Sequence, residues 1–282
     1  MVFVAWRRRR FIFLSAVGLF LVGLTLVGLR RSSIAATSPL PLLPGTFQYF
    51  HEADHHYKTH RFGAISHFDA RYVPLQQPTI DDVRRTLVAL LKSYTATMQK
   101  LGAETWIAHG VLLGWHWNQK LLPWDTDIDV QMSAGSLTLL ATSYNMSKHE
   151  YTPPGESAPR IYLLDINPHH TISSSRDVAN KIDARWIDTT NGKYVDITAV
   201  HSNTMSTTDV PSSSSELFCK DGHRYAREDL FPLRESTLED TLVKVPQQSA
   251  KILAEEYGKK SLTRERFHWH HFNQNTKTWE PE

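Results

Sequence analysis

Cysteine is nearly absent from this chain of 282 residues, which contains only Cys219. A single thiol excludes an intrachain disulfide and any zinc site built from several cysteines. The chain has 41% hydrophobic and 11% aromatic residues, which is enough for one sizeable folded core. This composition excludes a disordered tail.

Acidic residues are missing from the first 31 positions, where six of the chain's 31 basic residues lie. The other 25 basic residues face 29 acidic ones in residues 32–282, so the net charge of +2 arises at the N-terminus. A body with this balance lacks the overall positive field of nucleic-acid-binding proteins. We therefore predict no nucleic-acid partner.

A long uncharged run follows the four consecutive arginines of the N-terminus. If residues 11–29 are helical, they reach about 28 Å, which is close to the hydrocarbon thickness of a bilayer. Four arginines precede the run and two follow it, which predicts a cytosolic tail at residues 1–10, a transmembrane signal anchor at 11–29 and a lumenal body. An uncleaved anchor fits the Golgi better than secretion, so we predict a single-pass type II membrane protein of the Golgi. A cleaved signal peptide is the alternative, because the small residues at 32–38 resemble a cleavage site.

Beyond the anchor, the pattern changes at about residue 66. Residues 32–66 begin rich in serine and proline and are predicted to form a stalk and an irregular segment, whereas 67–282 are predicted to form the folded domain. The clearest helix begins after Pro78 and ends at Gly102, because its apolar residues recur on one helix face. Strands are predicted near 104–108, 127–132, 160–166, 184–189 and 193–200. This mixed order predicts an α+β domain, with helices packed on a sheet.

Acidic residues alternate along the segment PWDTDIDV at 123–130. Because side chains alternate along a strand, Asp127 and Asp129 share one face while the apolar residues between them point into the core. Two carboxylates on one face repel unless a cation lies between them, and a hard divalent cation would also hold the phosphates of a nucleotide. Asp125 would lie on the same face as Asp127 and Asp129, but it is close to the turn before the strand, so it is not assigned a role. The alternative is a solvated strand end whose acids face water.

A third acidic candidate, Asp196, lies in a later predicted strand. The preceding Asn191-Gly192 indicates a two-residue hairpin loop. Such a loop places Asp196 opposite Ile187 and Arg185 opposite Thr198, so that Arg185 lies diagonally beside Asp196 on the same face. Arg185 would then bind a phosphate through two hydrogen bonds. A structural ion pair between Arg185 and Asp196 is the alternative.

Three blocks of the sequence resemble the LicD family, especially its fungal members associated with mannosylphosphorylation. IAHGVLLGWHWNQKLLPWDTDIDVQM (107–132) resembles the signature block, and ARWIDTTNGKYVDITAV (184–200) resembles the second block. YAREDLFPLRESTLEDTLVKVP, followed by LAEEYG, resembles the weaker third block. The first block is long enough to be specific.

The resemblance implies a nucleotidyltransferase-like mixed sheet in which Asp127 and Asp129 on one strand and Asp196 on a later strand bind Mg²⁺ or Mn²⁺. It implies transfer of a phospho-group from a nucleotide diphosphate donor to a glycan or glycoprotein. Bacterial members transfer phosphocholine, fukutin-type members transfer ribitol phosphate, and the closest fungal members are linked to mannose phosphate. The superfamily's Gly-Ser pair at the helix start is not present as such, so Gly110 and Gly114 are the candidates for the phosphate-binding turn. The zinc-binding cysteines of fukutin-related members are also missing.

The implied reaction is in-line attack of a sugar hydroxyl on the β-phosphorus of the donor, with release of a nucleoside monophosphate. Asp196 would complete the metal site or accept the hydroxyl proton, and the sequence does not separate these roles. His109, at the turn before a predicted helix, would contact phosphate or instead hydrogen-bond the backbone at the helix start.

Two other functions fit the same residues. Metal-dependent glycosyltransferases also use an Asp-x-Asp pair, but they release a nucleoside diphosphate. An accessory protein without catalysis would retain the fold and support a partner transferase, because fungal relatives have been regarded as regulators. The sequence identifies neither the donor nucleotide nor the acceptor glycan.

Overall fold

The computed structural model describes residues 49–53, 57–59, 63–172, 180–202 and 216–282. The predicted cytosolic tail at 1–10 and membrane anchor at 11–29 lie outside these residues, as does the first part of the predicted stalk. Among the described residues, no helix combines the length and the apolar character needed to cross a membrane.

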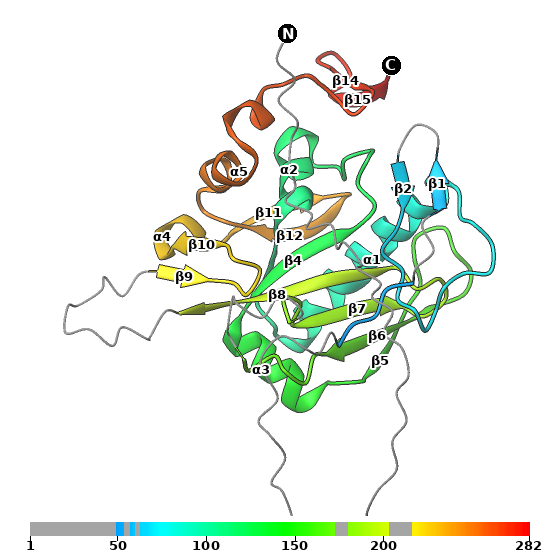
Figure 1. Ribbon diagram of the computed structural model, residues 1–282, viewed down its shortest axis with the longest axis vertical. Coiled ribbons are helices and arrows are strands. Elements are labelled where there is room, and N and C mark those ends of the chain that lie inside the picture. Colours follow the sequence, from blue (N-terminus) through cyan, green and yellow to red (C-terminus); the bar gives the residue numbers. More distant parts are fainter. Residues whose placement is uncertain (1–48, 54–56, 60–62, 173–179, 203–215) are drawn as a thin grey trace, which may run out of the picture. The chain divides into compact units, whose positions relative to one another are not determined.

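An eight-stranded mixed sheet is the main feature of the described residues, and it confirms the predicted α+β class (Figure 1). Six strands follow the order β10-β9-β8-β7-β6-β5, and β4 pairs with β8 on one side and with β3 on the other. The β4–β8 pair is parallel, whereas the other pairs are antiparallel. The strands are β3 (Thr105–Ile107), β4 (Ile128–Ser133), β5 (Lys148–Tyr151), β6 (Arg160–Ile166), β7 (Ala184–Asp188), β8 (Tyr194–Ser202), β9 (Glu216–Phe218) and β10 (Arg224–Ala226).

The longest helix, α1 (Ile80–Leu101), forms where the sequence predicts it. Thr79 caps its start by accepting a hydrogen bond from the backbone of Asp82, whose side chain bonds back to the Thr79 backbone. Gly102 ends the helix in the left-handed conformation that glycine adopts without strain. The apolar face of α1 packs on β7 and β8 (Figure 1).

The remaining elements are short. Two-stranded sheets and a three-stranded sheet are formed by β1 (Tyr57–Thr59) with β2 (Gly63–Ile65), β11 (Arg234–Leu238) with β12 (Thr241–Val245), and β13 (Arg266–Phe267), β14 (His270–Asn273) and β15 (Thr278–Pro281). The other helices are α2 (His109–Asn118), α3 (Ala134–Ser143), α4 (Arg227–Leu230), α5 (Ser249–Tyr257) and the 3-10 turn η1 (Lys259–Leu262). Helix α2 packs on β4 and on α5, so these three elements lie together.

The hairpin between β7 and β8 differs from the prediction. Its loop has four residues, 189–192, rather than the two residues Asn191-Gly192, and the register places Arg185 directly opposite Asp196. The Asp188 side chain lengthens the loop because it accepts hydrogen bonds from the Thr190 backbone and the Asn191 side chain. The prediction of a diagonal relation was wrong by two residues. A shift by two residues keeps the same face, so Arg185 and Asp196 still share one face.

Candidate functional site

The three predicted aspartates lie in the parallel strands β4 and β8 or directly before β4. Asp127 immediately precedes β4, Asp129 lies in β4 and Asp196 lies in β8. The register places Asp129 directly beside Asp196, and aligned residues of neighbouring strands point to the same face of a sheet. The adjoining Ile128 and Ile197 are fully buried on the other face. We refer to Asp127, Asp129 and Asp196 as the aspartate centre.

Two side chains from the segment before α1 lie next to the aspartate centre. His67 Nε2 is 3.5 Å from Asp127 Oδ2, and His67 Nδ1 is 3.5 Å from Glu52 Oε2. Burial alone would lower the pKa of His67, but its contacts with Glu52 and Asp127 raise that pKa above its ordinary value. Burial alone would raise the pKa of Glu52, but His67 and Arg185 lower it to about 2. Sequence reasoning missed both residues, because they lie in a segment without periodicity.

Arg185 connects Glu52 to the aspartate centre. Its Nε is 2.8 Å from Asp196 Oδ1, and its Nη2 is 3.1 Å from Glu52 Oε1. The guanidinium carbon lies 3.7 Å from the centroid of the Tyr194 ring, so the charge is also stabilised by an aromatic face. Burial raises the pKa of Asp196, and Arg185 acts against this rise. The structure therefore contains the ion pair that was the alternative for Arg185, while its contact with phosphate stays a prediction.

Lys193 is a buried cation that the sequence did not reveal. Its side chain is 2% exposed, and Nζ donates hydrogen bonds to the backbone oxygens of Ser66, at 2.5 Å, and Thr126, at 2.6 Å. Burial lowers the pKa of Lys193 to about 8, although Asp127 and Glu52 act in the opposite direction. The aspartate centre thus has positive groups on several sides.

A second group of titratable residues surrounds the start of α2. His109 Nδ1 is 2.8 Å from Glu256 Oε1, and His109 Nε2 is 3.5 Å from Asp221 Oδ2. The ring of His223 packs on that of His109 with centroids 4.6 Å apart. We call these four residues the His109 cluster. Sequence reasoning proposed only His109, because the other three lie more than 100 residues further along the chain.

The carboxylates of the His109 cluster control its charge. Burial alone would lower the pKa of His109, but Asp221 and Glu256 raise it well above its ordinary value, and Asp129 contributes to this rise. The backbone N–H of Ala108, the residue before His109, donates to the backbone oxygen of Asp129 at 3.3 Å, so the cluster lies beside the aspartate centre. Both ring nitrogens of His109 thus face carboxylates, rather than the backbone as in the alternative prediction. A phosphate contact of His109 stays a prediction.

Gly110 and Gly114 are positions of close approach within α2. A Cβ atom on Gly110 would lie 2.8 Å from Asp125 Oδ2, and one on Gly114 would lie 2.4 Å from the backbone oxygen of Lys120. Both separations are too short for a side chain, so these glycines allow the segment before β4 to pack on α2. Their predicted binding of phosphate is not tested by this geometry.

The two groups of residues offer different ligands to a metal. The aspartate centre offers carboxylate oxygens, the donors that Mg²⁺ and Mn²⁺ prefer, so its residues fit the predicted ions by donor type. Among the described residues, only His109, Asp221 and His223 form a set of three whose ligand atoms all lie within 4.8 Å of one another. The oxygens of the aspartate centre are not gathered to that degree.

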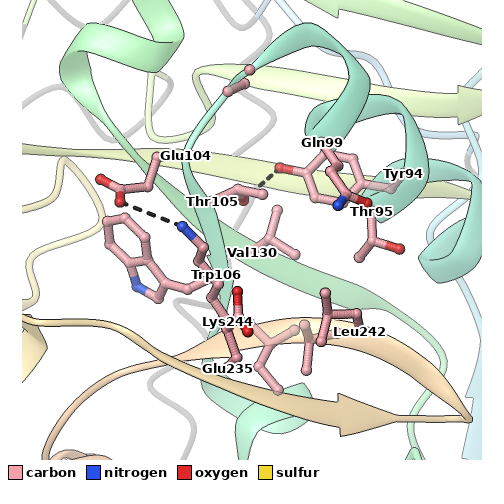
Figure 2. A pocket seen from close by; sticks show the side chains of 14 residues that line it. Tyr94, Thr95, Gln99, Glu104, Thr105, Trp106, Val130, Glu235, Leu242 and Lys244 are labelled. Atoms are coloured by element: carbon pink, nitrogen blue, oxygen red, sulfur yellow. Dashed lines mark hydrogen bonds and ion pairs between the residues drawn. The ribbon is translucent and has the colours of Figure 1, made fainter.

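A pocket of about 270 Å³ lies elsewhere, between the end of α1, β3 and the β11–β12 hairpin (Figure 2). Figure 2 shows Glu104 paired with Lys244, with 3.7 Å between Oε1 and Nζ, at its edge. Val130 of β4 contributes to its lining, and alternation places Val130 on the opposite face from Asp129. The pocket is therefore separate from the aspartate centre.

Comparison with known proteins identifies a family to which part of the chain is similar. Residues 102–248 match the family described as "LicD/FKTN/FKRP, nucleotidyltransferase domain". The matched segment includes the whole aspartate centre and all eight strands of the large sheet. Glu256 of the His109 cluster lies after it.

Two proteins of Saccharomyces cerevisiae are similar to the chain. "Mannosyltransferase regulator 4" is 32% identical over 187 residues, which are 65% of this chain and 15% of the relative. "Mannosyltransferase regulator 14" is 32% identical over 148 residues, which are 52% of this chain and 15% of the relative. The matches thus cover a small part of each relative. The family match spans more than half of the chain, and this chain therefore belongs to the LicD family of nucleotidyltransferase-domain proteins.

Proposed function

We propose that this LicD domain transfers a sugar phosphate, or a similar phospho-group, from a nucleotide diphosphate donor to a glycan or glycoprotein. Mannosylphosphate transfer is the form favoured by the relatives named as mannosyltransferase regulators. The parallel β4–β8 pair carries the proposal, because it brings Asp129 and Asp196 together from positions 67 residues apart. A strand edge with solvated acids would not need this long-range pairing.

The aspartate centre fits Mg²⁺ or Mn²⁺ by the chemistry of its donors. Asp127, Asp129 and Asp196 would hold the ion, which when bound would neutralise charge on the diphosphate. Asp196 is held in place by Arg185, so that its carboxylate keeps one orientation. Asp127 has a longer contact, with His67 Nε2 3.5 Å from its Oδ2.

The residues around the centre would bind and orient the donor. Arg185 Nη1 is buried and has no hydrogen bond to the described residues, so it remains available to a phosphate oxygen. The acceptor hydroxyl would attack the β-phosphorus in line, forming the new P–O bond while the bond to the bridging oxygen breaks. The nucleoside monophosphate leaves with that oxygen, and Asp196 would complete the metal site or accept the hydroxyl proton.

An accessory role is the second candidate. The two yeast relatives are named as regulators of mannosyltransferase, which supports a domain that assists a partner transferase. In that case the ion pairs of Asp127 and Asp196 would be structural and would persist during function.

Donor turnover by the purified full-length chain tests the proposal. The chain would be incubated with Mn²⁺, a mannoside acceptor, and GDP-mannose or UDP- and CDP-linked donors. Chromatography would identify the released nucleotide, and ³¹P NMR would detect the phosphodiester. We expect nucleoside monophosphate from the wild type and a loss of roughly a hundredfold or more in Asp127→Asn and Asp129→Asn, because each removes a charged group from the transition state.

Asp240→Asn is the matched control, because the Asp240 side chain is 87% exposed and lies outside the site. It should turn over donor as the wild type does. Normal turnover in Asp127→Asn and Asp129→Asn would overturn the role of the aspartate centre. Release of a nucleoside diphosphate would instead identify a glycosyltransferase. The accessory role would be established by two results together. The purified wild type would be inactive with every donor, yet its expression would restore glycan phosphorylation in cells from which this protein has been deleted.

A further inference from the structure

Three separate segments bring nitrogen and oxygen ligands together in the His109 cluster. His109 begins α2, Asp221 and His223 lie in the turn between β9 and β10, and Glu256 lies in α5. The side chains of these four residues are between 11% and 35% exposed, so the cluster is partly buried but reached by solvent. It is separate from the three aspartates that carry the proposed transfer.

The turn between β9 and β10 directs one carboxylate oxygen toward both imidazoles. Asp221 Oδ1 accepts a hydrogen bond from the backbone nitrogen of His223 at 3.1 Å. The other oxygen, Oδ2, lies 3.0 Å from His223 Nδ1 and 3.5 Å from His109 Nε2. Gly222, with φ of +101°, allows the backbone to bring Asp221 and His223 to the same side.

The separation of His109 from Asp221 suits two ligands of one metal ion better than a hydrogen bond. Ligands about 2.1 Å from a tetrahedral zinc ion lie about 3.4 Å from one another, which is close to the 3.5 Å between Asp221 Oδ2 and His109 Nε2. His223 Nδ1 is buried and forms no well-aligned hydrogen bond to any described residue, although Asp221 is near. The site thus contains a nitrogen that is close to a carboxylate but not oriented for bonding to it.

Glu256 supplies the outer partner that metal-bound histidines usually have. His109 Nδ1 lies 2.8 Å from Glu256 Oε1, which leaves Nε2 directed toward Asp221. A carboxylate on the second ring nitrogen fixes the orientation of a metal-bound imidazole and increases its basicity. The backbone at His109 has φ of +51°, a strained value for this residue that the surrounding contacts must maintain.

We propose that His109 Nε2, Asp221 and His223 form a binding site for a divalent transition-metal ion, with Glu256 as the outer partner of His109. Two imidazoles and one carboxylate favour Zn²⁺ over Mg²⁺, which prefers a shell of oxygens. Three protein ligands leave a fourth tetrahedral position for water or for an oxygen of a bound molecule. The site is expected to bind its ion whether or not the aspartate centre catalyses transfer.

Metal titration of the purified full-length chain, stripped with a chelator, tests this site. Zn²⁺ binding would be followed by calorimetry, and Co²⁺ would report geometry through its visible absorption, which is stronger in a tetrahedral site with nitrogen ligands than in an octahedral shell of oxygens. We expect one Zn²⁺ per chain. His223→Gln and Asp221→Asn should weaken binding by more than about tenfold, the lower limit for loss of an outer partner, and Glu256→Gln by about tenfold or more.

His271→Gln is the matched control, because His271 also faces a glutamate, with Nε2 3.6 Å from Glu280 Oε2, but lies outside the cluster. It should bind Zn²⁺ as the wild type does. Asp129→Asn should also keep the tetrahedral Co²⁺ spectrum, so failure of this site and failure of the proposed transfer are distinguishable. Circular dichroism identifies a variant that does not fold, and the partly exposed His223 provides the decisive substitution if Asp221→Asn is unfolded. Absence of stoichiometric Zn²⁺ binding by the wild type, or unchanged affinity in a folded His223→Gln, would overturn the proposal.

Discussion

The aspartate centre and the His109 cluster both collect carboxylates around histidine, yet they are built in opposite ways. In the aspartate centre, Asp127 and Asp196 each have a separate partner, His67 or Arg185, and the three carboxylates lie in the adjacent strands β4 and β8 or directly before β4. In the His109 cluster, Asp221 faces two imidazoles at once. The first arrangement balances charge pair by pair. The second already has several ligand atoms facing one point.

Removing the positive partner of Asp196 should produce the largest change in stability. Arg185→Met leaves the Asp196 carboxylate in the sheet without its ion pair, which costs about 3–5 kcal/mol of unfolding free energy. The cost should fall as pH falls, because burial already raises the pKa of Asp196 and protonation removes its charge. Urea unfolding of the wild type and the variant at pH 5 and pH 7.5 measures both effects.

Two further variants determine whether the charge of Asp196 causes that loss. Arg185→Met combined with Asp196→Asn should recover part of the stability, because no buried carboxylate is left unpaired. Arg224→Met removes an exposed ion pair with Glu216 and should cost about 1 kcal/mol or less. Equal losses in the double and single variants would show that Arg185 acts through packing.

The comparison becomes sharper at alkaline pH, because Lys193 places a buried amine beside the aspartate centre. Its pKa is lowered to about 8 in the folded chain, from 10.5, so between these values the unfolded chain holds more protons. The contribution of Lys193 to unfolding free energy therefore increases by about 3 kcal/mol as pH rises from 8 to 10.5. In Lys193→Met this increase should be absent, as measured by urea unfolding across that range.

Lys244→Met controls for the loss of one positive charge, because Lys244 is 43% exposed at its side chain. Its unfolding free energy should follow the wild type with pH. If the unfolding free energy of Lys193→Met also follows that of the wild type with pH, the Lys193 amine is not deprotonated in the folded chain. It then keeps its positive charge beside the aspartate centre at high pH.

Local signals predicted α1 and the faces of β4 and β8, because these depend on periodicity and capping within a short window. The same alternation predicted which face of the sheet carries Asp127, Asp129 and Asp196. The parallel alignment of β4 with β8 could not be derived from local pattern, since it depends on how distant segments pack. The loop at 189–192 was misjudged because the Asp188 side chain, rather than the Asn-Gly pair alone, determines its length.

Apart from Lys193, which directly precedes β8, the missed residues share one property: each reaches a site from a distant segment. Glu52 and His67 approach from before α1, and Asp221, His223 and Glu256 come from after β8. None has a periodic neighbourhood that indicates its partner. The family resemblance identified the three aspartates, but it did not reveal His67 and Lys193 beside them or the His109 cluster.

The smallest expected effect is at Glu52, which joins His67 and Arg185 at the edge of the aspartate centre. Its pKa of about 2 means that its ion contacts stabilise the fold above the ordinary pKa of 4.5, and that this stability is lost as pH falls toward 2. Because the Glu52 side chain is 37% exposed, solvent screening reduces the effect, and Glu52→Gln should cost about 1 kcal/mol at pH 7. Urea unfolding at pH 7 and pH 3 should show that the difference in unfolding free energy between Glu52→Gln and the wild type is smaller at pH 3. Glu235→Gln, at an exposed glutamate of β11, should show no such change with pH. A difference that stays constant with pH would mean that Glu52 acts through packing, and that the charges of the aspartate centre are balanced without the segment before α1.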